Sequence, residues 1–380
     1  MGKYLTKSLF KVFLLYLIDT LFKPIFSIFI NKKIPKSIKK ILIVKPDHLG
    51  DMILTTSIFK HLKDKYNEAL IDIVCGEWAL PIIENNPYIR HKFVINVAFA
   101  NRKNLSKIKK IFESIKTYFS SLVKIRKEKY DVALFLRSRR GNLISLALIG
   151  NIKYTIGHGT AGFGFLLSNE VKWEKGKHEL EHYLELLKPI GIEKAIIDLK
   201  PQLFTKEEDI AKAKEFYNSL NTTSKIAILH PGSGNMVKTI SIDRWQKVLE
   251  ILISNGYYVV ITGSKSEENF AKRIATKEKN LTIATGVFDI KSLFEFFKLA
   301  DLIITVDSLS AHLAAMTEVK TLVFYSGVSD INQWRAVGSN ITNFKIYCPD
   351  SPCEMKCRYN YACMKFDVEE ILNKELKALS

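Results

Sequence analysis

The stretch ILIVKPDHLGDMILTTSIFKHLK, residues 41–63, decides the fold class of this chain. Its first residues, Ile41–Lys45, form a short and nearly continuous apolar run, which is typical of a parallel strand buried on both faces. A polar turn with Gly50 follows, and apolar side chains then recur at helical spacing from Met52 to Tyr66. A strand, a tight turn and a helix in this order predict the start of an α/β domain.

The same alternation extends along the chain in two series. Further strands are expected at Leu70–Cys75, Phe93–Val97, Asp131–Leu136, Lys153–Ile156, Ile226–His230, Tyr257–Thr262, Leu281–Ala284, Leu302–Val306 and Thr321–Tyr325. Two such series predict an α/β protein with two Rossmann-like, doubly wound domains that face a cleft. In such sheets ligands bind at the carboxyl ends of the strands, so the chemistry is expected there.

The chain has 380 residues, which is room for about two domains. We divide it into a basic N-terminal segment (1–38), a first Rossmann-like domain (39–200), a linker (201–224), a second Rossmann-like domain (225–350) and a Cys-containing loop with a C-terminal helix (351–380). With 47% hydrophobic and 25% charged residues, the composition is that of a globular protein and excludes general disorder.

The net charge of +18 is concentrated in two segments. Residues 1–45 carry +9 and residues 102–129 carry +8, so the rest of the chain is nearly neutral. A nucleic-acid-binding protein usually spreads its basic residues over the binding domain, so no nucleic-acid partner is expected. The two segments instead predict contact with an anionic membrane surface.

The N-terminal segment has the pattern of an amphipathic helix. Lys3, Lys7 and Lys11 are spaced to share one helical face, with Leu and Phe side chains largely on the other. This pattern is typical of a helix lying in a membrane interface. A helix packed on the protein's own surface is an alternative. A signal peptide or spanning segment is disfavoured, because Asp19 interrupts the short apolar run Val12–Ile18.

Four of the five cysteines cluster near the C-terminus. They are Cys348, Cys353, Cys357 and Cys363, and Cys75 stands apart. Their spacing lacks the C-x-x-C knuckle typical of zinc sites. A structural metal site, a redox-sensitive clasp and reduced thiols in a tight loop all remain open.

Two familiar motifs are set aside. His178–His182 matches H-E-x-x-H, but no third ligand motif follows, so we expect an exposed helix start and no zinc. Gly157–Gly162 matches G-x-G-x-x-G, but the residues after it look extended rather than helical. We therefore expect a flexible loop at the cleft and no dinucleotide site.

The first strand-end motif is Lys45–Asp51. Asp51 falls at a helix N-terminus, where the helix dipole and free N–H groups are expected to favour its ionised form. An ionised carboxylate at a cleft can take a proton from a hydroxyl nucleophile. A simple helix cap is the alternative.

Three further motifs follow strands of the second series. Gly232 and Ser233 lie in the turn HPGSGN, whose amides can cradle phosphate oxygens, and Lys238 adds a positive charge. Glu267, after the turn TGS, can accept hydrogen bonds from ribose hydroxyls. The fourth motif, VDSLSAHLAA, places Asp307, Ser308 and His312 around a helix N-terminus that can hold an anion. Ordinary turns and a helix-start acid are the alternatives.

Together these motifs resemble glycosyltransferase family 9, the lipopolysaccharide heptosyltransferases. The resemblance covers roughly residues 39–370 and is carried by ILIVKPDHLGDMILTTSIFKHLK, HPGSGNMVK, GYYVVITGSKSE and ADLIITVDSLSAHLAA followed by TLVFYSG. It implies a GT-B fold and an inverting transfer from ADP-heptose that needs no metal or other cofactor. It also implies a lipid-linked saccharide acceptor, a lipopolysaccharide core or similar glycan, reached at the inner face of the cytoplasmic membrane.

The resemblance also assigns residue roles. Asp51 would be the catalytic base in an acceptor-binding first domain, where His48, Arg137, Arg139 and Arg140 would contact the acceptor. The second domain would bind the donor through Gly232, Ser233, Lys238, Glu267, Asp307, Ser308, Leu309 and His312. Leu309 stands where many members have Gly. A transferase using another nucleotide sugar for capsule or glycoprotein glycans is therefore the alternative, and an inactive membrane-surface binding protein is another.

Overall fold

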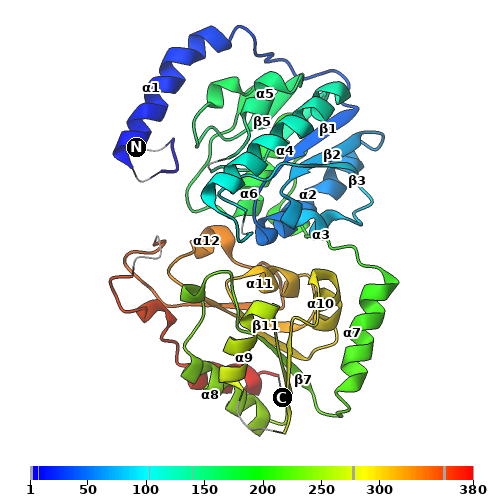
Figure 1. The fold of residues 1–380 in the computed structure, drawn as a ribbon, viewed down its shortest axis with the longest axis vertical. Helices are drawn as coiled ribbons and strands as arrows, with labels where there is room; N and C mark the ends of the chain where they lie inside the picture. The colour runs from blue at the N-terminus through cyan, green and yellow to red at the C-terminus, as the bar shows by residue number, and fades with distance from the viewer. Residues whose placement is uncertain are drawn as a thin grey trace. The chain divides into compact units, whose positions relative to one another are not determined.

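The computed structural model describes residues 3–6, 8–101, 103–139, 141–275, 279–353 and 357–379. The chain divides into two compact units, Met1–Leu203 and Phe204–Ser380, and each is described by itself (Figure 1). In both units a parallel sheet carries helices between its strands, as the sequence predicted. Each sheet has six strands rather than the five expected, because Asn169–Glu170 and Ile341–Lys345 each add an edge strand.

The first unit is built on strands in the order β3-β2-β1-β4-β5-β6. Their bounds are β1 Lys40–Val44, β2 Leu70–Cys75, β3 Ile89–Val94, β4 Val132–Phe135, β5 Tyr154–Gly157 and β6 Asn169–Glu170. The chain runs outward from β1 to β3 and then crosses to β4, so the switch point lies between β1 and β4. Strand β3 starts earlier than the expected Phe93–Val97, because Ile89 already pairs with Ile71 of β2.

Helices cover both faces of this sheet. They are α1 Leu9–Phe26, α2 Leu49–Lys65, α3 Leu80–Ile83, α4 Lys107–Glu128, α5 Ser145–Ile149 and α6 Glu179–Leu187, with short 3₁₀ turns at Glu77–Ala79 (η1), Gly164–Leu166 (η2), Lys188–Ile190 (η3) and Ile196–Asp198 (η4). Leu42 and Val44 of β1 share a hydrophobic cluster with residues of α4, α5 and η2. Because strand side chains alternate, Ile41 and Ile43 point to the opposite face.

The second unit repeats the plan with the order β12-β11-β10-β7-β8-β9. Its strands are β7 Ile226–His230, β8 Tyr258–Gly263, β9 Leu281–Thr285, β10 Leu302–Val306, β11 Lys320–Tyr325 and β12 Ile341–Lys345. Its helices are α7 Glu207–Ser219, α8 Ile242–Ser254, α9 Glu268–Ile274, α10 Ile290–Phe297, α11 Leu309–Ala314, α12 Ile331–Trp334 and α13 Val368–Lys377, with 3₁₀ turns η5 Met236–Lys238, η6 Lys265–Glu267 and η7 Ala362–Met364. The switch point lies between β7 and β10.

Helix α7 lies within residues 201–224, for which the sequence suggested a linker. It packs against α10 through Phe216, whose ring stands edge-on to Phe296 at 5.2 Å between centroids. Phe288 completes this aromatic cluster at 5.0 Å from Phe216. These ring contacts, centred on buried Phe296, attach α7 to the body of the second unit.

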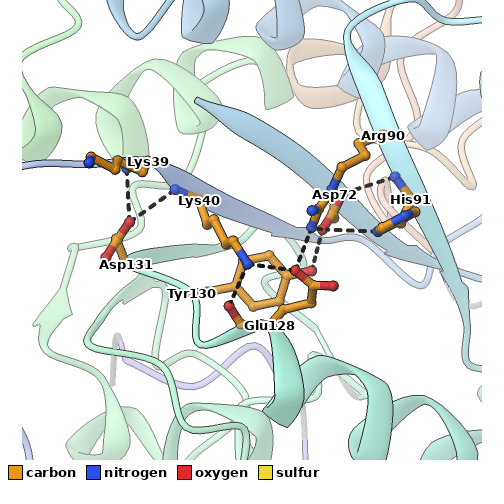
Figure 2. Close-up of polar contacts among 8 residues, drawn as sticks. All are labelled: Lys39, Lys40, Asp72, Arg90, His91, Glu128, Tyr130 and Asp131. Atoms are coloured by element: carbon orange, nitrogen blue, oxygen red, sulfur yellow. Dashed lines mark hydrogen bonds and ion pairs between the residues drawn. The ribbon is translucent and has the colours of Figure 1, made fainter. Parts of the chain in front are cut away.

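A polar network joins the strands of the first unit near their amino-terminal ends (Figure 2). Asp72 is fully buried and accepts hydrogen bonds from Arg90 Nε at 3.0 Å and from the Tyr130 hydroxyl at 2.5 Å. Arg90 also donates to Glu128 at 2.7 Å, and Lys40 donates to the same carboxylate at 2.8 Å. These hydrogen bonds lower the pKa of Glu128 to about 2. The network links neighbouring strands at the end of the sheet opposite the carboxyl ends, where the chemistry is predicted.

The N-terminal segment differs from the expected amphipathic pattern. Helix α1 begins only at Leu9, so Lys3 is not on it, and Lys7 lies outside the described residues. The predicted lysine face is therefore wrong for Lys3, which instead forms ion pairs with Asp19 and Glu170 at 3.1 and 2.8 Å. Buried Asp19 also accepts from the Phe163 amide at 2.7 Å, so the polar side of α1 faces the protein. Among the described helices none is long and apolar enough to cross a bilayer.

Candidate active site

The predicted site residues of the first unit lie at the switch point, after strand β1. Asp51 is in the first turn of α2, three residues after the N-terminal cap His48. No described residue donates a hydrogen bond to the side-chain carboxylate of Asp51. The backbone carbonyl of Asp51 accepts from the Thr55 hydroxyl at 2.9 Å. The carboxylate can therefore accept from a substrate hydroxyl.

The electrostatics of Asp51 correct the expectation from sequence. Burial and the neighbouring Asp47 and Glu179 carboxylates raise the pKa of Asp51 to about 7, while Lys45 and Arg137 act in the opposite direction. The helix N-terminus was expected to favour the ionised form. It is outweighed because desolvation and nearby carboxylates both disfavour a further negative charge.

Lys45 is the buried cation beside Asp51. Its ammonium donates to Glu179 Oε1 and to the Leu136 carbonyl, both at 3.2 Å, and lies 3.5 Å from Asp47. It also lies 5.1 Å from the centre of the Tyr183 ring. Burial alone would lower the pKa of Lys45, but Tyr183, Glu179 and Asp47 together raise it well above its ordinary value. Lys45 therefore remains charged inside the unit.

Asp47 is held as a carboxylate by two cations. Its side chain pairs with the Arg137 guanidinium and accepts from the His48 amide at 3.0 Å. Burial opposes the charge, but Lys45 and Arg137 lower the pKa of Asp47. Since Asp47 stays ionised, the group in this cluster that can take up a proton near neutral pH is Asp51.

The arginines expected at the acceptor are placed differently from one another. Arg137 is buried, pairs with Asp47 and stacks over Phe99 at 4.7 Å from the ring centre. Arg139 is exposed, and Arg140 lies outside the described residues. The structure thus assigns Arg137 to the support of Asp47, and Arg139 is the described arginine of this loop on the surface.

The H-E-x-x-H segment corrects another expectation. His178 caps α6 by accepting from the Leu180 amide at 3.2 Å, but the predicted exposed helix start is wrong. His178, Glu179 and His182 are all at most 2% exposed. His182 stacks on Trp173 at 4.9 Å, and Glu179 neutralises Lys45. Within the described residues, no group of three His, Cys, Asp or Glu side chains is placed to hold a metal ion.

Sequence reasoning missed Lys45, Glu179 and Tyr183 as parts of this site. A signal was present, because Lys45 ends an otherwise apolar buried strand and a buried cation needs an acid partner. The partner comes from 134 positions further along the chain. Spacing along the sequence does not reveal such a pair.

The glycine motif at Gly157–Gly162 serves packing. A Cβ on Gly159 would lie 2.0 Å from Glu170 Oε1, and a Cβ on Gly164 would lie 2.4 Å from the same atom. The short turn η2 and strand β6 follow the motif. The glycines therefore make room for Glu170, which agrees with setting aside a dinucleotide site here.

In the second unit, Lys238 and Asp307 meet at the carboxyl edge of the sheet. The Lys238 ammonium lies 2.9 Å from Asp307, which also accepts a hydrogen bond from the Ser329 hydroxyl. Ser233 shapes the loop before Lys238, since its hydroxyl donates to the Asn235 carbonyl at 2.6 Å and accepts from the Asn235 amide at 3.1 Å. The structure thus joins the second and fourth predicted motifs through one ion pair.

Glu267 lies directly over the Gly232 loop. A Cβ on Gly232 would come within 1.9 Å of Glu267 Oε1, so a larger residue here would require this carboxylate to move. Glu267 accepts from the Ser264 amide and hydroxyl, both at 2.7 Å. Nearby, burial lowers the pKa of His230 to about 4, so this imidazole is neutral at pH 7. The second and third motifs therefore form one surface.

The fourth motif is tied to β7 by hydroxyl groups. Thr305 donates to the His230 carbonyl at 3.0 Å and lies 2.6 Å from the Ser310 hydroxyl, which is 2.6 Å from that of Ser308. His312 is buried within α11, and Leu309 is half-buried at its start. The chain of hydroxyls sets the turn that follows β10.

The four clustered cysteines line one pocket of the second unit. Cys348, Cys353, Cys357 and Cys363 are all free thiols there, and Val237 of η5 lines the same pocket. The Gly327 amide donates to Cys363 Sγ at 3.2 Å, and the Tyr361 amide donates to Cys357 Sγ at 3.1 Å. The pocket therefore adjoins the loop that carries Lys238.

Comparison with known proteins gives consistent matches. Residues 119–362 match the model of glycosyltransferase family 9 (heptosyltransferase). Lipopolysaccharide heptosyltransferase 3 of Escherichia coli K12 is 27% identical over 302 residues, which cover 78% of this chain and 84% of that protein. Among solved structures, the family 9 glycosyltransferase of Veillonella parvula matches with a TM-score of 0.78 at 21% identity, covering 91% of this chain and 98% of its own. The E. coli ADP-heptose lps heptosyltransferase II matches with a TM-score of 0.67 at 19% identity, and the match covers 90% of this chain and 100% of that structure. The structural matches confirm the predicted fold class.

Proposed function

The chain belongs to glycosyltransferase family 9, and on that premise we propose that it transfers heptose from ADP-heptose to a lipopolysaccharide core or a similar surface glycan. Family membership makes it a glycosyltransferase. The lipopolysaccharide acceptor is supported by the name of its E. coli relative, and the ADP-sugar donor by that of a structural neighbour. The observation that carries the proposal is Asp51, a carboxylate in the first turn of α2 whose pKa is raised to about 7.

Asp51 acts as general base on the acceptor hydroxyl. A base works best when its pKa lies near the working pH, because it is then both available and basic enough. Burial and Asp47 raise the pKa of Asp51 into this range. The Lys45 ammonium balances the negative charges of Asp47 and Glu179 beside it. Attack on the anomeric carbon from the side opposite the nucleotide inverts its configuration. General-base assistance of this kind contributes roughly 10²–10⁴-fold in rate.

Lys238 and the amides of the Gly232 loop receive the leaving nucleoside diphosphate. Negative charge grows on the diphosphate as the glycosidic bond breaks, and positioned cations and N–H groups stabilise it. Lys238 is paired with Asp307 at 2.9 Å, so the donor phosphates compete with this carboxylate for the ammonium. Glu267 and the hydroxyl of half-buried Ser308 are proposed to meet donor hydroxyl groups, and buried Ser310 supports Ser308 at 2.6 Å. The proposed reaction assigns no step to a metal ion.

The acceptor in this proposal is lipid-linked, and helix α1 supports residence at the inner face of the cytoplasmic membrane. Its polar residue Asp19 faces the protein, whereas Phe10, Phe13 and Tyr16 are more than 60% exposed. An outward apolar face beside a basic segment is typical of helices that lie in a membrane interface. Surface residence would raise the local concentration of a lipid-linked acceptor.

The test measures release of ADP and formation of the glycosylated product. The full-length protein is incubated with ADP-heptose and a truncated, water-soluble core saccharide, and the anomeric configuration of the product is read by NMR. We expect ADP release that depends on the acceptor. A panel of other nucleotide sugars is run in parallel. Preferred turnover of another donor would overturn the heptose assignment, and no turnover with any donor would support an inactive binding protein.

A further inference from the structure

Helix α4 presents a row of large apolar side chains to solvent. Six of them are between 48% and 67% exposed: Ile108, Ile111, Phe112, Ile115, Phe119 and Val123. The same helix contacts the core through Leu122 and Ile125, which are 9% and 0% exposed. The exposed row therefore extends the apolar surface of α4 well beyond the part that packs on the sheet. Contiguous exposed apolar surface of this kind marks an interaction site.

The exposed row forms a single stripe along the helix. Its members recur at steps of three and four residues, which keeps them on one side of an α-helix. At 100° per residue, Lys109, Lys116 and Lys127 lie along one border of that stripe. None of these three lysines forms an ion pair with a described residue, whereas both acids of the helix are engaged. Glu128 pairs with Lys40 and Arg90, and Glu113 accepts from Asn101.

Helix α1 offers a similar surface on the same side of the sheet. Ile18 and Phe26 of α1 join the hydrophobic cluster that also contains Leu122 and Ile125 of α4, with α5 contributing to the same cluster. An apolar pocket of about 310 Å³ lies between α1, α5 and η2, lined by Ile18, Phe22, Phe26, Leu148, Phe163, Phe165 and Leu166. Figure 1 shows α4 crossing the sheet of the first unit. Two helices that pack on one core thus also carry apolar side chains that point away from it.

We propose that α4 is a second membrane-inserting element, whose apolar stripe enters an anionic phospholipid bilayer while its lysines contact the headgroups. The charge of the helix argues for this occupant, because unpaired lysines beside an apolar stripe complement anionic lipid and let their aliphatic stems follow the apolar surface. The inference rests on the proposed membrane residence and deepens it. The sequence indicated only charge in residues 102–129, whereas the structure adds the exposed apolar stripe on which the proposed insertion depends.

Salt separates the two kinds of contact. Attraction between lysines and anionic headgroups fades as the Debye length falls to roughly 3–4 Å near molar salt, whereas apolar insertion persists. The experiment therefore uses full-length protein and sedimentation with vesicles of phosphatidylcholine and phosphatidylglycerol, at low and high salt. The variant Phe112→Ser/Ile115→Ser/Phe119→Ser removes the centre of the stripe. Its matched control is Lys109→Gln/Lys116→Gln/Lys127→Gln.

We expect the serine variant to bind vesicles about tenfold more weakly at high salt, even with α1 intact, because two linked contacts reinforce each other. The glutamine variant should lose affinity at low salt and match the wild type at high salt. Both variants change exposed residues, so their melting temperatures should stay within a few degrees of wild type. Transfer to the water-soluble acceptor should be unchanged, which separates this inference from the proposed chemistry.

A single tryptophan substitution tests how deeply α4 inserts into the bilayer. Phe119→Trp should add fluorescence that shifts to shorter wavelength with anionic vesicles and is quenched by brominated lipid chains, relative to wild type. Tyr347→Trp, at a residue of the second unit that is 84% exposed, is the control and should add neither effect.

Equal high-salt binding of the serine variant and the wild type would overturn the role of α4 while leaving α1 as an anchor. A wild-type dimer in solution that the serine variant abolishes, without any difference in vesicle binding, would identify a second copy as the occupant instead.

Discussion

The Lys45 ammonium lies 3.2 Å from the Glu179 carboxylate, and both side chains are at most 2% exposed. Lys45 directly follows strand β1, whereas Glu179 starts helix α6 134 residues later. A buried cation is costly unless an acid compensates it, so the pair is required once Lys45 is placed inside the unit. Because both charges act on Asp51, their pairing helps to set the proton affinity of the proposed base.

Asp51→Asn should abolish transfer. The amide cannot take the hydroxyl proton, so kcat is expected to fall by about 10²–10⁴-fold, while the dissociation constant for the donor stays within a few-fold because the donor residues belong to the other unit. Steady-state kinetics and titration calorimetry measure the two quantities. Asp64→Asn, at an exposed position of the same helix, is the control and should keep wild-type activity. Near-normal turnover of Asp51→Asn would exclude Asp51 as base.

Transfer should rise with pH through about 7. The pKa of Asp51 is raised to about 7, so below that pH the carboxyl is protonated and cannot act as a base. The acid limb of kcat/KM should therefore have an apparent pKa near 7 and a slope of one. Glu179→Gln removes a negative neighbour and should move this limb to lower pH. A limb near pH 4, the ordinary range of an Asp, would contradict the raised pKa.

Lys45 and Glu179 should be strongly coupled in stability. Lys45→Met leaves Glu179 buried without its cation, and Glu179→Gln leaves Lys45 with less compensation, so each is expected to cost about 3–5 kcal/mol in the free energy of unfolding. The double variant should cost less than the two single losses combined, with an interaction energy of about 1–3 kcal/mol. Urea unfolding of the four proteins measures the cycle. Additive losses would show that the two charges do not interact.

Lys238→Ala should weaken donor binding and slow the leaving-group step together. The substitution removes the cation that is proposed to receive the diphosphate, so kcat/KM for the donor should fall by roughly 10²-fold or more. Lys265→Ala, at an exposed lysine of the same unit, is the matched control. Unchanged kinetics of Lys238→Ala, measured by ADP release, would assign the phosphates to another group.

Gly232→Ala should displace Glu267. The added Cβ would lie 1.9 Å from the Glu267 carboxylate, so the side chain or the loop must move, and donor affinity should fall. Glu267→Ala on the same background removes the clash and should restore the stability lost by Gly232→Ala. Thermal melts and donor titrations of the single and double variants measure both effects. A fully stable, fully active Gly232→Ala protein would show that the loop and Glu267 separate freely.

Much of the fold was predictable because strand and helix patterns are local. The apolar run Ile41–Val44 predicted a buried parallel strand, and the turn residues placed Asp51 at the start of α2. The structure also brings Lys238 to Asp307 and Glu267 to Gly232, as strand ends on one sheet edge should meet. The buried α6 and the outward apolar face of α4 were not foreseen, because periodicity does not tell which of two faces packs on the core.

The sequence by itself determined the α/β class, the two repeated βα series, the strand-end motifs and the family resemblance. These depend on residue types at short spacing, which the backbone converts directly into strands, turns and helices. Only the tertiary structure decided that Glu179 neutralises Lys45, that Arg137 supports Asp47, and that the pKa of Asp51 rises to about 7 rather than falling. The physical reason is that desolvation and Coulomb interactions depend on distance in space, and the charges that govern Asp51 are as far apart in the chain as Lys45 and Glu179.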